Sequence, residues 1–282
     1  MALYRDTPED SLQDDFDEII FQNHALGRNI LGTEETVSSF KKEDFINFIG
    51  KHIDTSKIIL SSVGSFSFNK ILKLAEKYVG DIQQMSSNRN RIDYQGYKPV
   101  NIEVRKPISQ AHCAVGTTTY PLQHPDRLKL FMLLNILGGP GMNSRLNLSL
   151  REKYGYVNGI AASYSPFPDT GALGIYFATE QRNLKKSLQL IWKEFDKLKN
   201  QSMGRLQLHT AKQQLKGQLA MSEENYSGMM LMMAKSMLDL NEIISIDTIF
   251  NKIDQVTAYD LLEIANDVLE KDQMSVLSYL PE

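Results

Sequence analysis

Apolar side chains near the start of the chain recur at the spacing of an amphipathic helix. Leu12, Phe16 and Ile19 follow Thr7 and Pro8, a capping residue and a proline that are typical of a helix start. Periodic apolar positions also predict a helix over 41–53, a strand over 57–64 (KIILSSVG) and a helix over 68–79. Residues 83–100 are polar and aperiodic, which predicts a linker.

The rest of the chain alternates between strand and helix patterns. Strands are predicted over 101–106, 110–120, 156–165, 171–180 and 274–280, and helices over 125–137, 143–153 and, three or four in number, within 181–270. The segments 156–165 and 171–180 are close enough to form an antiparallel pair. No Gly-rich dinucleotide turn accompanies the alternation, so the pattern favours a mixed α+β layer over a doubly wound sheet.

An internal repeat appears when the chain is shifted by 216 residues. Residues 36–64 then fall on residues 252–280 without gaps. The paired positions include Val37 with Ile253, Phe40 with Val256, Asp44 with Asp260, Phe45 with Leu261, and Ile53 with Leu269. Any helix followed by a strand gives some agreement, so chance similarity is the alternative. If a second copy begins near Asn101, its partner would begin about 115 residues before residue 1, and the first copy is expected to be incomplete.

Composition and charge narrow the class of protein. The chain has 282 residues, of which 42% are hydrophobic and 23% charged, with a net charge of −3 and scattered basic residues, so no nucleic-acid partner is expected. The apolar alternation around Cys113, the single cysteine, favours a buried structural thiol. The longest apolar run is interrupted by Lys129 and is too short for a membrane span, and no signal peptide is visible. We expect a soluble chain, cytoplasmic or periplasmic.

Four motifs, in order along the chain, resemble the insulinase/pitrilysin family of zinc peptidases, in the branch that includes the mitochondrial processing peptidases. The motifs are YRDTPED (4–10), HALGRNILGTEETV (24–37), LGGPGMNSRLNLSLREKYGY (137–156) and PDTGALGIYFAT (168–179). The resemblance implies duplicated α+β domains that face each other like a clamshell. It divides the chain into the C-terminal half of a first domain (1–82), a linker (83–100) and a complete second, non-catalytic domain (101–282).

The resemblance also implies zinc chemistry that this chain lacks. The family holds zinc with the motif H-x-x-E-H and a downstream Glu, leaving one coordination position for the attacking water. No H-x-x-E-H is present, and the third-ligand Glu would lie just before Met1. The five histidines are isolated and are expected to be surface or capping residues: His24, His52, His112, His124 and His209. Zinc is therefore expected in the full-length parent, and this chain alone is expected to hold none and to be inactive.

The glycine-rich turn at residues 138–141 has three interpretations. A phosphate cradle is disfavoured, because no Lys-Ser or Lys-Thr follows the glycines. A tight turn leading into a helix is expected in any case. In the family, the Arg of that helix and a Tyr seven residues later hold the substrate backbone. Arg151 matches the first position, but Asn158 stands at the second, and Tyr156, two residues earlier, would point to the same face of a strand and could substitute.

Two functions follow from the resemblance. In the first, the chain is the substrate-binding, chamber-forming C-terminal portion of a zinc metallopeptidase that cleaves peptides. In the second, it belongs to a non-catalytic family subunit that binds peptide or supports assembly with an active partner. The expected partners are a peptide substrate and either a second copy of the chain or an active subunit.

Overall fold

The computed structural model describes residues 7–87 and 91–282, which form two compact units. The first unit comprises the chain up to Gly32 together with Asp93–Leu215 and Lys252–Glu282. The second comprises Thr33–Ile92 and Lys216–Asn251. The predicted division at residues 82 and 100 stays a prediction.

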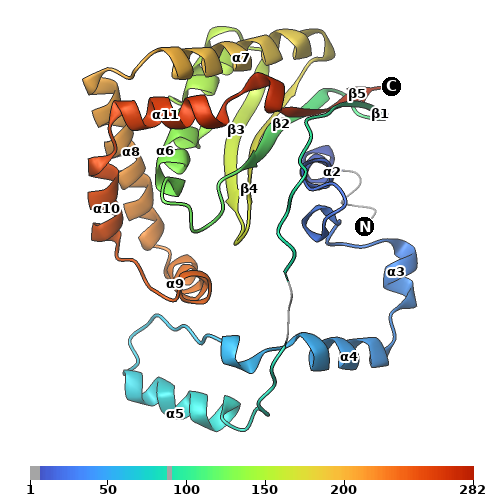
Figure 1. The fold of residues 1–282 in the computed structure, drawn as a ribbon, viewed down its shortest axis with the longest axis vertical. Helices are drawn as coiled ribbons and strands as arrows, with labels where there is room; N and C mark the ends of the chain where they lie inside the picture. Colours follow the sequence, from blue (N-terminus) through green and yellow to red (C-terminus); the bar gives the residue numbers. More distant parts are fainter. Residues whose placement is uncertain (1–6, 88–90) are drawn as a thin grey trace. The chain divides into compact units, whose positions relative to one another are not determined.

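A five-stranded mixed sheet forms the centre of the first unit (Figure 1). Its order is β1-β5-β2-β4-β3, with β1 and β5 parallel and the other neighbours antiparallel. The strands are β1 (Asn101–Lys106), β2 (Ala111–Thr119), β3 (Val157–Pro166), β4 (Gly171–Thr179) and β5 (Ser275–Pro281). All five predicted strands beyond the linker are present, and the β3–β4 antiparallel pair is confirmed.

Helix α2 (Pro8–Ile20) covers one face of this sheet. Its buried Leu12 and Phe16 pack in one cluster with Ala114 of β2 and with Leu277 and Tyr279 of β5. The Phe16 ring also meets the Tyr176 ring edge-on, with 6.0 Å between centroids. The helix predicted after Thr7 therefore exists because its apolar stripe has a sheet to cover.

The opposite face of the sheet carries α6 (Arg127–Gly138), α7 (Leu184–Asn200) and α11 (Ala258–Val268) (Figure 1). Gly138 at the end of α6 lies so close to β3 that a Cβ there would be 2.8 Å from the Cβ of Ala162. Ala162 is paired with Ile175, one residue before Tyr176 in β4, so alternation places α6 on the face opposite α2. The α+β class predicted from the sequence is confirmed as a mixed sheet packed by helices.

Part of the predicted linker is attached to the first unit. Residues 91–100 form neither helix nor strand. Within them, the Tyr94 hydroxyl donates to the Ile20 carbonyl at 2.7 Å and the Tyr97 hydroxyl donates to the Gln273 carbonyl at 2.9 Å. Tyr94 and Tyr97 therefore anchor this part of the predicted linker to the first unit.

The second unit confirms two predicted helices and corrects one predicted strand. Its first segment holds α3 (Glu34–Ser39), α4 (Lys42–His52), the 3₁₀ turn η2 (Thr55–Lys57) and α5 (Phe68–Val79). The strand predicted over 57–64 is wrong: past Lys57 the segment has neither strand nor helix and is not part of the sheet. Its β-branched residues favour extended backbone, but a strand also needs a neighbouring strand for its hydrogen bonds.

Five α-helices, rather than the three or four predicted, occupy residues 181–270. They are α7, α8 (Arg205–Glu223), α9 (Tyr226–Leu240), α10 (Ile246–Gln255) and α11. Local polar residues divide them: the Asn225 side chain accepts from the Gly228 N–H at the start of α9, and Asn241 ends that helix in the left-handed conformation with φ 56°. The short turns η1 (Ala25–Gly27), η4 (Gln181–Asn183) and η5 (Lys271–Gln273) complete the described elements.

Candidate functional site

The glycine-rich turn after α6 is a packing device. Gly138 lets α6 approach β3, as described above. A Cβ on Gly139 would lie 2.6 Å from the backbone carbonyl oxygen of Asn135, which cannot move aside easily, whereas a Cβ on Gly141 would meet Nε2 of Gln214, the end of a flexible side chain. The expectation of a tight turn is confirmed, and the close approach to neighbouring protein atoms explains the glycines without a phosphate.

The turn leads into η3 (Asn147–Lys153), a π-helical segment where an ordinary helix was predicted. Its inner side is held by buried Leu150 and by Asn147, whose Nδ2 donates to Ser144 Oγ at 2.9 Å and to the Ile160 carbonyl at 3.4 Å. Such wide turns are uncommon and are frequent at functional sites. They also rotate the residues that follow relative to a regular helix, so the direction of the Arg151 side chain could not be deduced from sequence spacing.

Arg151 lies near the end of η3 with its side chain 42% exposed. Its Nε is 3.7 Å from Oε1 of the adjacent Glu152, beyond hydrogen-bond distance. An exposed pair of this kind contributes at most about 1 kcal/mol and competes weakly with another partner. The guanidinium is thus accessible to a ligand.

Tyr156 follows the end of η3, and the backbone there fixes its position. Gly155, in the left-handed conformation with φ 61°, ends the helix, and the Tyr156 N–H donates to the Leu150 carbonyl at 2.9 Å. Thr179 Oγ1 donates to the Tyr156 carbonyl at 2.6 Å. The Tyr156 ring stacks on Tyr154 with 5.4 Å between centroids. These contacts, rather than a strand, set its position.

Asn158 is exposed and lies where the pairing of β3 with β4 is irregular, between Val157 and Ile160. A bulge of this kind breaks the strand's alternation, so the argument that placed Tyr156 and Asn158 on one face of a strand does not hold here. In the described part of the chain, no hydrogen bond, ion pair or ring contact joins Arg151 to Tyr156 or Asn158. The three residues are close in sequence, and their roles stay predictions.

No metal centre is formed by residues 7–87 and 91–282: no group of three or more His, Cys, Asp or Glu side chains there could hold an ion. His24 Nδ1 accepts from the Leu26 N–H at 3.3 Å, and His124 Nδ1 accepts from the Asp126 N–H at 3.1 Å, so both are capping residues as expected. His112 is buried in β2, so the expectation of a surface or capping histidine is wrong at this position, and burial lowers its pKa. Tyr4–Asp6 of the first motif lie outside the described residues. The donor set present does not fit zinc.

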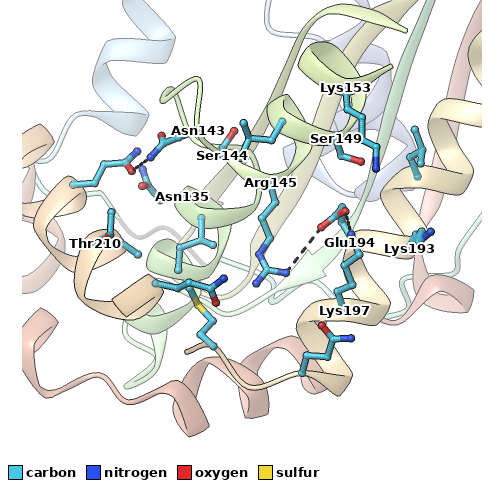
Figure 2. Close-up of a pocket in the computed structure, with 18 of the residues that line it drawn as sticks. Asn135, Asn143, Ser144, Arg145, Ser149, Lys153, Lys193, Glu194, Lys197 and Thr210 are labelled. Carbon is cyan, nitrogen blue, oxygen red and sulfur yellow. Dashed lines mark hydrogen bonds and ion pairs between the residues drawn. The ribbon is translucent and has the colours of Figure 1, made fainter. Parts of the chain in front are cut away.

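Sequence reasoning missed a cavity of about 780 Å³ that η3, α7 and α8 enclose (Figure 2). Lys153 and Tyr154, the second and third residues after Arg151, belong to its wall. So do Arg145 of the turn and Glu194 of α7, which approach within 3.9 Å. The sequence does not distinguish Glu194 from an exposed glutamate of an amphipathic helix. Only the fold shows that Glu194 is buried and which residues surround it.

No helix within the described ranges combines the length and the apolar character that crossing a membrane requires.

Comparisons with known proteins agree with the resemblance drawn from the motifs. The chain is 27% identical over 272 residues to "Uncharacterized zinc protease YmxG" of Bacillus subtilis, covering 96% of this chain and 66% of that protein. It is 26% identical over 279 residues to "Probable mitochondrial-processing peptidase subunit beta" of Schizosaccharomyces pombe, covering 91% and 60%. The chain thus spans somewhat less than two thirds of the length of these relatives.

A solved structure and a family model complete the comparison. The crystal structure of the peptidase M16 inactive domain from Pseudomonas fluorescens superposes with a TM-score of 0.88 at 18% identity, covering all of this chain and 68% of that one. The model of the family described as "Peptidase M16 inactive domain" matches residues 39–215. The chain therefore belongs to the peptidase M16 family, the insulinase family of zinc proteases, and carries its inactive domain.

Proposed function

We propose that this chain is the substrate-binding, chamber-forming C-terminal portion of a zinc metallopeptidase that cleaves peptides. Family membership and the zinc proteases among its relatives support the reaction class. The proposal assigns the zinc ligands of the parent to residues outside this chain, and no group of three or more His, Cys, Asp or Glu side chains in residues 7–87 and 91–282 could hold an ion. The proposal gives this chain the task of binding and orienting the peptide.

The proposed organisation is half of a first domain over 1–82, a linker over 83–100 and a complete second domain over 101–282. Its support is the 216-residue repeat, in which α4 corresponds to α11 and η2 to η5. A chamber between two such domains would exclude water from a bound peptide.

Arg151 carries the proposal. Its guanidinium presents several N–H donors in a planar fork, which suits a peptide carbonyl on which negative charge develops. The single observation behind this assignment is that the side chain is exposed at the end of η3 with only a long contact to Glu152. Tyr156 and Asn158, close to Arg151 in sequence, would add hydrogen bonds to the peptide backbone.

Substitution of Arg151 in the full-length parent tests the proposal. Arg151→Ala should lower kcat/KM by on the order of tenfold to a thousandfold with little change in Tm, since the lost interaction strengthens in the transition state. Arg151→Lys should recover part of the loss, because an ammonium lacks the fork. Arg182→Ala is the matched control: Arg182 is also exposed and paired with a nearby acid, Glu180, but is not close to Arg151 in sequence. Unchanged cleavage by Arg151→Ala, or a loss that unfolding explains, would return Arg151 to a surface ion pair.

The second candidate is a non-catalytic subunit that binds peptide or supports an active partner. Asn158 favours it, because a shorter side chain at the expected Tyr position weakens a substrate contact. The relative named as a processing-peptidase subunit is consistent with it. Reading the roughly 115 residues encoded before Met1 separates the two: H-x-x-E-H followed by Glu makes the parent an enzyme, and its absence makes it a partner subunit.

A further inference from the structure

The cavity between η3, α7 and α8 has a charge opposite to that of the chain. Among the described residues that line it are one carboxylate, Glu194, and four cations: Arg145, Lys153, Lys193 and Lys197. The formal charge of this lining is therefore +3, four positive charges against one negative, whereas the whole chain carries −3. All of these residues lie in the first unit. Cations concentrated in a concave site raise the local concentration of anions.

Glu194 neutralises only part of this charge. It is buried, and its Oε1 accepts from Lys197 Nζ at 2.5 Å. Its other oxygen, Oε2, is 3.9 Å from Arg145 Nη1, which is an electrostatic contact but not a hydrogen bond. One carboxylate shared in this way leaves the guanidinium with donors to spare.

Arg145 points into the hollow. Figure 2 shows its side chain extending from the turn before η3 toward α7, with the dashed line ending on Glu194. The side chain is 22% exposed, and within the described chain no hydrogen bond to its guanidinium is found. A half-buried guanidinium with unused N–H groups is satisfied best by an anion with planar oxygens, such as a carboxylate.

The rest of the wall is apolar or neutral. Leu148 and Leu206 expose much of their side chains, and Met203 and Tyr154 lie beside them. A small inorganic anion would gain no favourable contact with these apolar side chains. A volume of about 780 Å³ lies within the range of roughly 300–1,000 Å³ of ligand pockets and accommodates several side chains. The ligand that matches both parts of the wall carries carboxylates and apolar groups together.

We propose that this cavity binds a peptide segment containing acidic and apolar side chains, with the acidic groups on Arg145 and Lys193 and the apolar groups on Leu148 and Leu206. The inference deepens the proposed function, on which it rests for the peptide nature of the ligand. The cavity would give the chain a preference for acidic peptides. Arg151 would not give such a preference, because in the proposed function it contacts the peptide backbone.

Fluorescence anisotropy on the purified 282-residue chain tests the inference with two short labelled peptides, one of alternating Glu and Leu and the other of alternating Gln and Leu. The acidic peptide should bind at least about tenfold more tightly at low ionic strength, and added salt should reduce the difference by screening. Lys193→Gln and Arg145→Gln should each weaken the acidic peptide about tenfold and leave the neutral one unchanged. Lys193 is exposed, and the ion pairs of Glu194 are with Arg145 and Lys197, so Lys193→Gln should keep the fold even if Arg145→Gln does not.

Arg182→Gln, an exposed arginine away from the cavity, is the matched control and should bind like the unmodified chain. Equal affinity for the two peptides, no binding of either, or an equal loss in the control would overturn the inference. Full displacement by millimolar inorganic phosphate with no dependence on Leu would also overturn it, since it would indicate a general anion site. The cleavage assay on Arg151→Ala reports separately on the proposed function, because Arg151 is outside the cavity wall.

Discussion

Two segments of the chain, residues 41–64 and 257–280, share their local structure and differ in what covers them. Adding 216 to the bounds of α4 gives 258–268, the bounds of α11, and the same shift carries η2 onto η5. Both helices have an acid in the first turn that accepts from the backbone before it: Asp44 accepts from the Lys41 N–H at 2.9 Å, and Asp260 accepts from the Thr257 N–H at 2.7 Å. Local sequence is sufficient for this agreement.

Burial separates the two segments. Phe45 of α4 is 59% exposed, whereas Leu261 at the equivalent position of α11 is 2% exposed, because α11 packs against α6 and α7. After the helix, residues 58–64 belong to no sheet, whereas β5 lies between β1 and β2. The same kind of sequence becomes a core strand only where other strands and helices supply its partners.

Hydrogen exchange on the isolated chain should show the largest difference between the segments. Amides of β5 are paired on both sides, so most should exchange only when the first unit opens. Amides of residues 59–64, outside the sheet, should exchange about a thousandfold or more faster. Peptide-level mass spectrometry measures both segments in one sample. Similar protection of the two would show that residues 59–64 have found a partner, such as a second copy of the chain.

Matched truncations should give the next largest effect. Leu261→Ala removes a buried side chain and should lower the free energy of unfolding by about 2–5 kcal/mol. Phe45→Ala removes an exposed one and should change it by less than about 0.5 kcal/mol. Urea unfolding followed by circular dichroism measures both. Ile264→Ala and Phe48→Ala, equivalent to each other at the same offset, form a second pair. If Phe45→Ala proved as costly as Leu261→Ala, the face of α4 would be covered in solution and the comparison would fail.

The comparison also explains how much of the fold the sequence could predict. Periodicity and caps were enough for α2, α4, α5 and for all five strands of the sheet. The strand over 57–64 was wrong, because a pattern of β-branched residues records a preference and not the presence of a neighbour. The number of helices predicted within residues 181–270 was also wrong, since single asparagines at helix ends decide where one helix becomes two.

The sequence names the residues of the candidate site, whose roles stay predictions, but it does not give their geometry. Motif spacing led to Arg151, and the structure places it on the surface at the end of η3. The π-helical turn and the bulge at Asn158 each add a local irregularity that shifts side-chain directions, so neither regular helix nor strand spacing applies there. The cavity could not be predicted from the sequence, because its charged residues come from separate elements and only folding brings Arg145 close to Glu194.

The smallest effect should appear at the paired capping acids. Asp260 carries more partners than Asp44: besides Thr257, its Oδ1 meets Lys129 Nζ at 2.7 Å. The hydrogen bond from Lys129, followed by that from Thr257, lowers the pKa of Asp260 from 3.8 to about 2. A carboxyl whose pKa is lower in the folded state stabilises the fold above its unfolded pKa, and this contribution is lost as the pH falls from about 4 toward 2.

Because the Asp260 carboxylate is partly solvated and Lys129 keeps Asp126 as a second partner, Asp260→Asn should cost only about 1 kcal/mol at pH 7. Asp44→Asn, which weakens a cap alone, should cost about 0.5 kcal/mol or less. The difference between the two variants in thermal unfolding should shrink as the pH is lowered through this window. A difference that is absent at pH 7, or that persists unchanged at the acidic end, would show that the Lys129 contact does not distinguish α11 from α4.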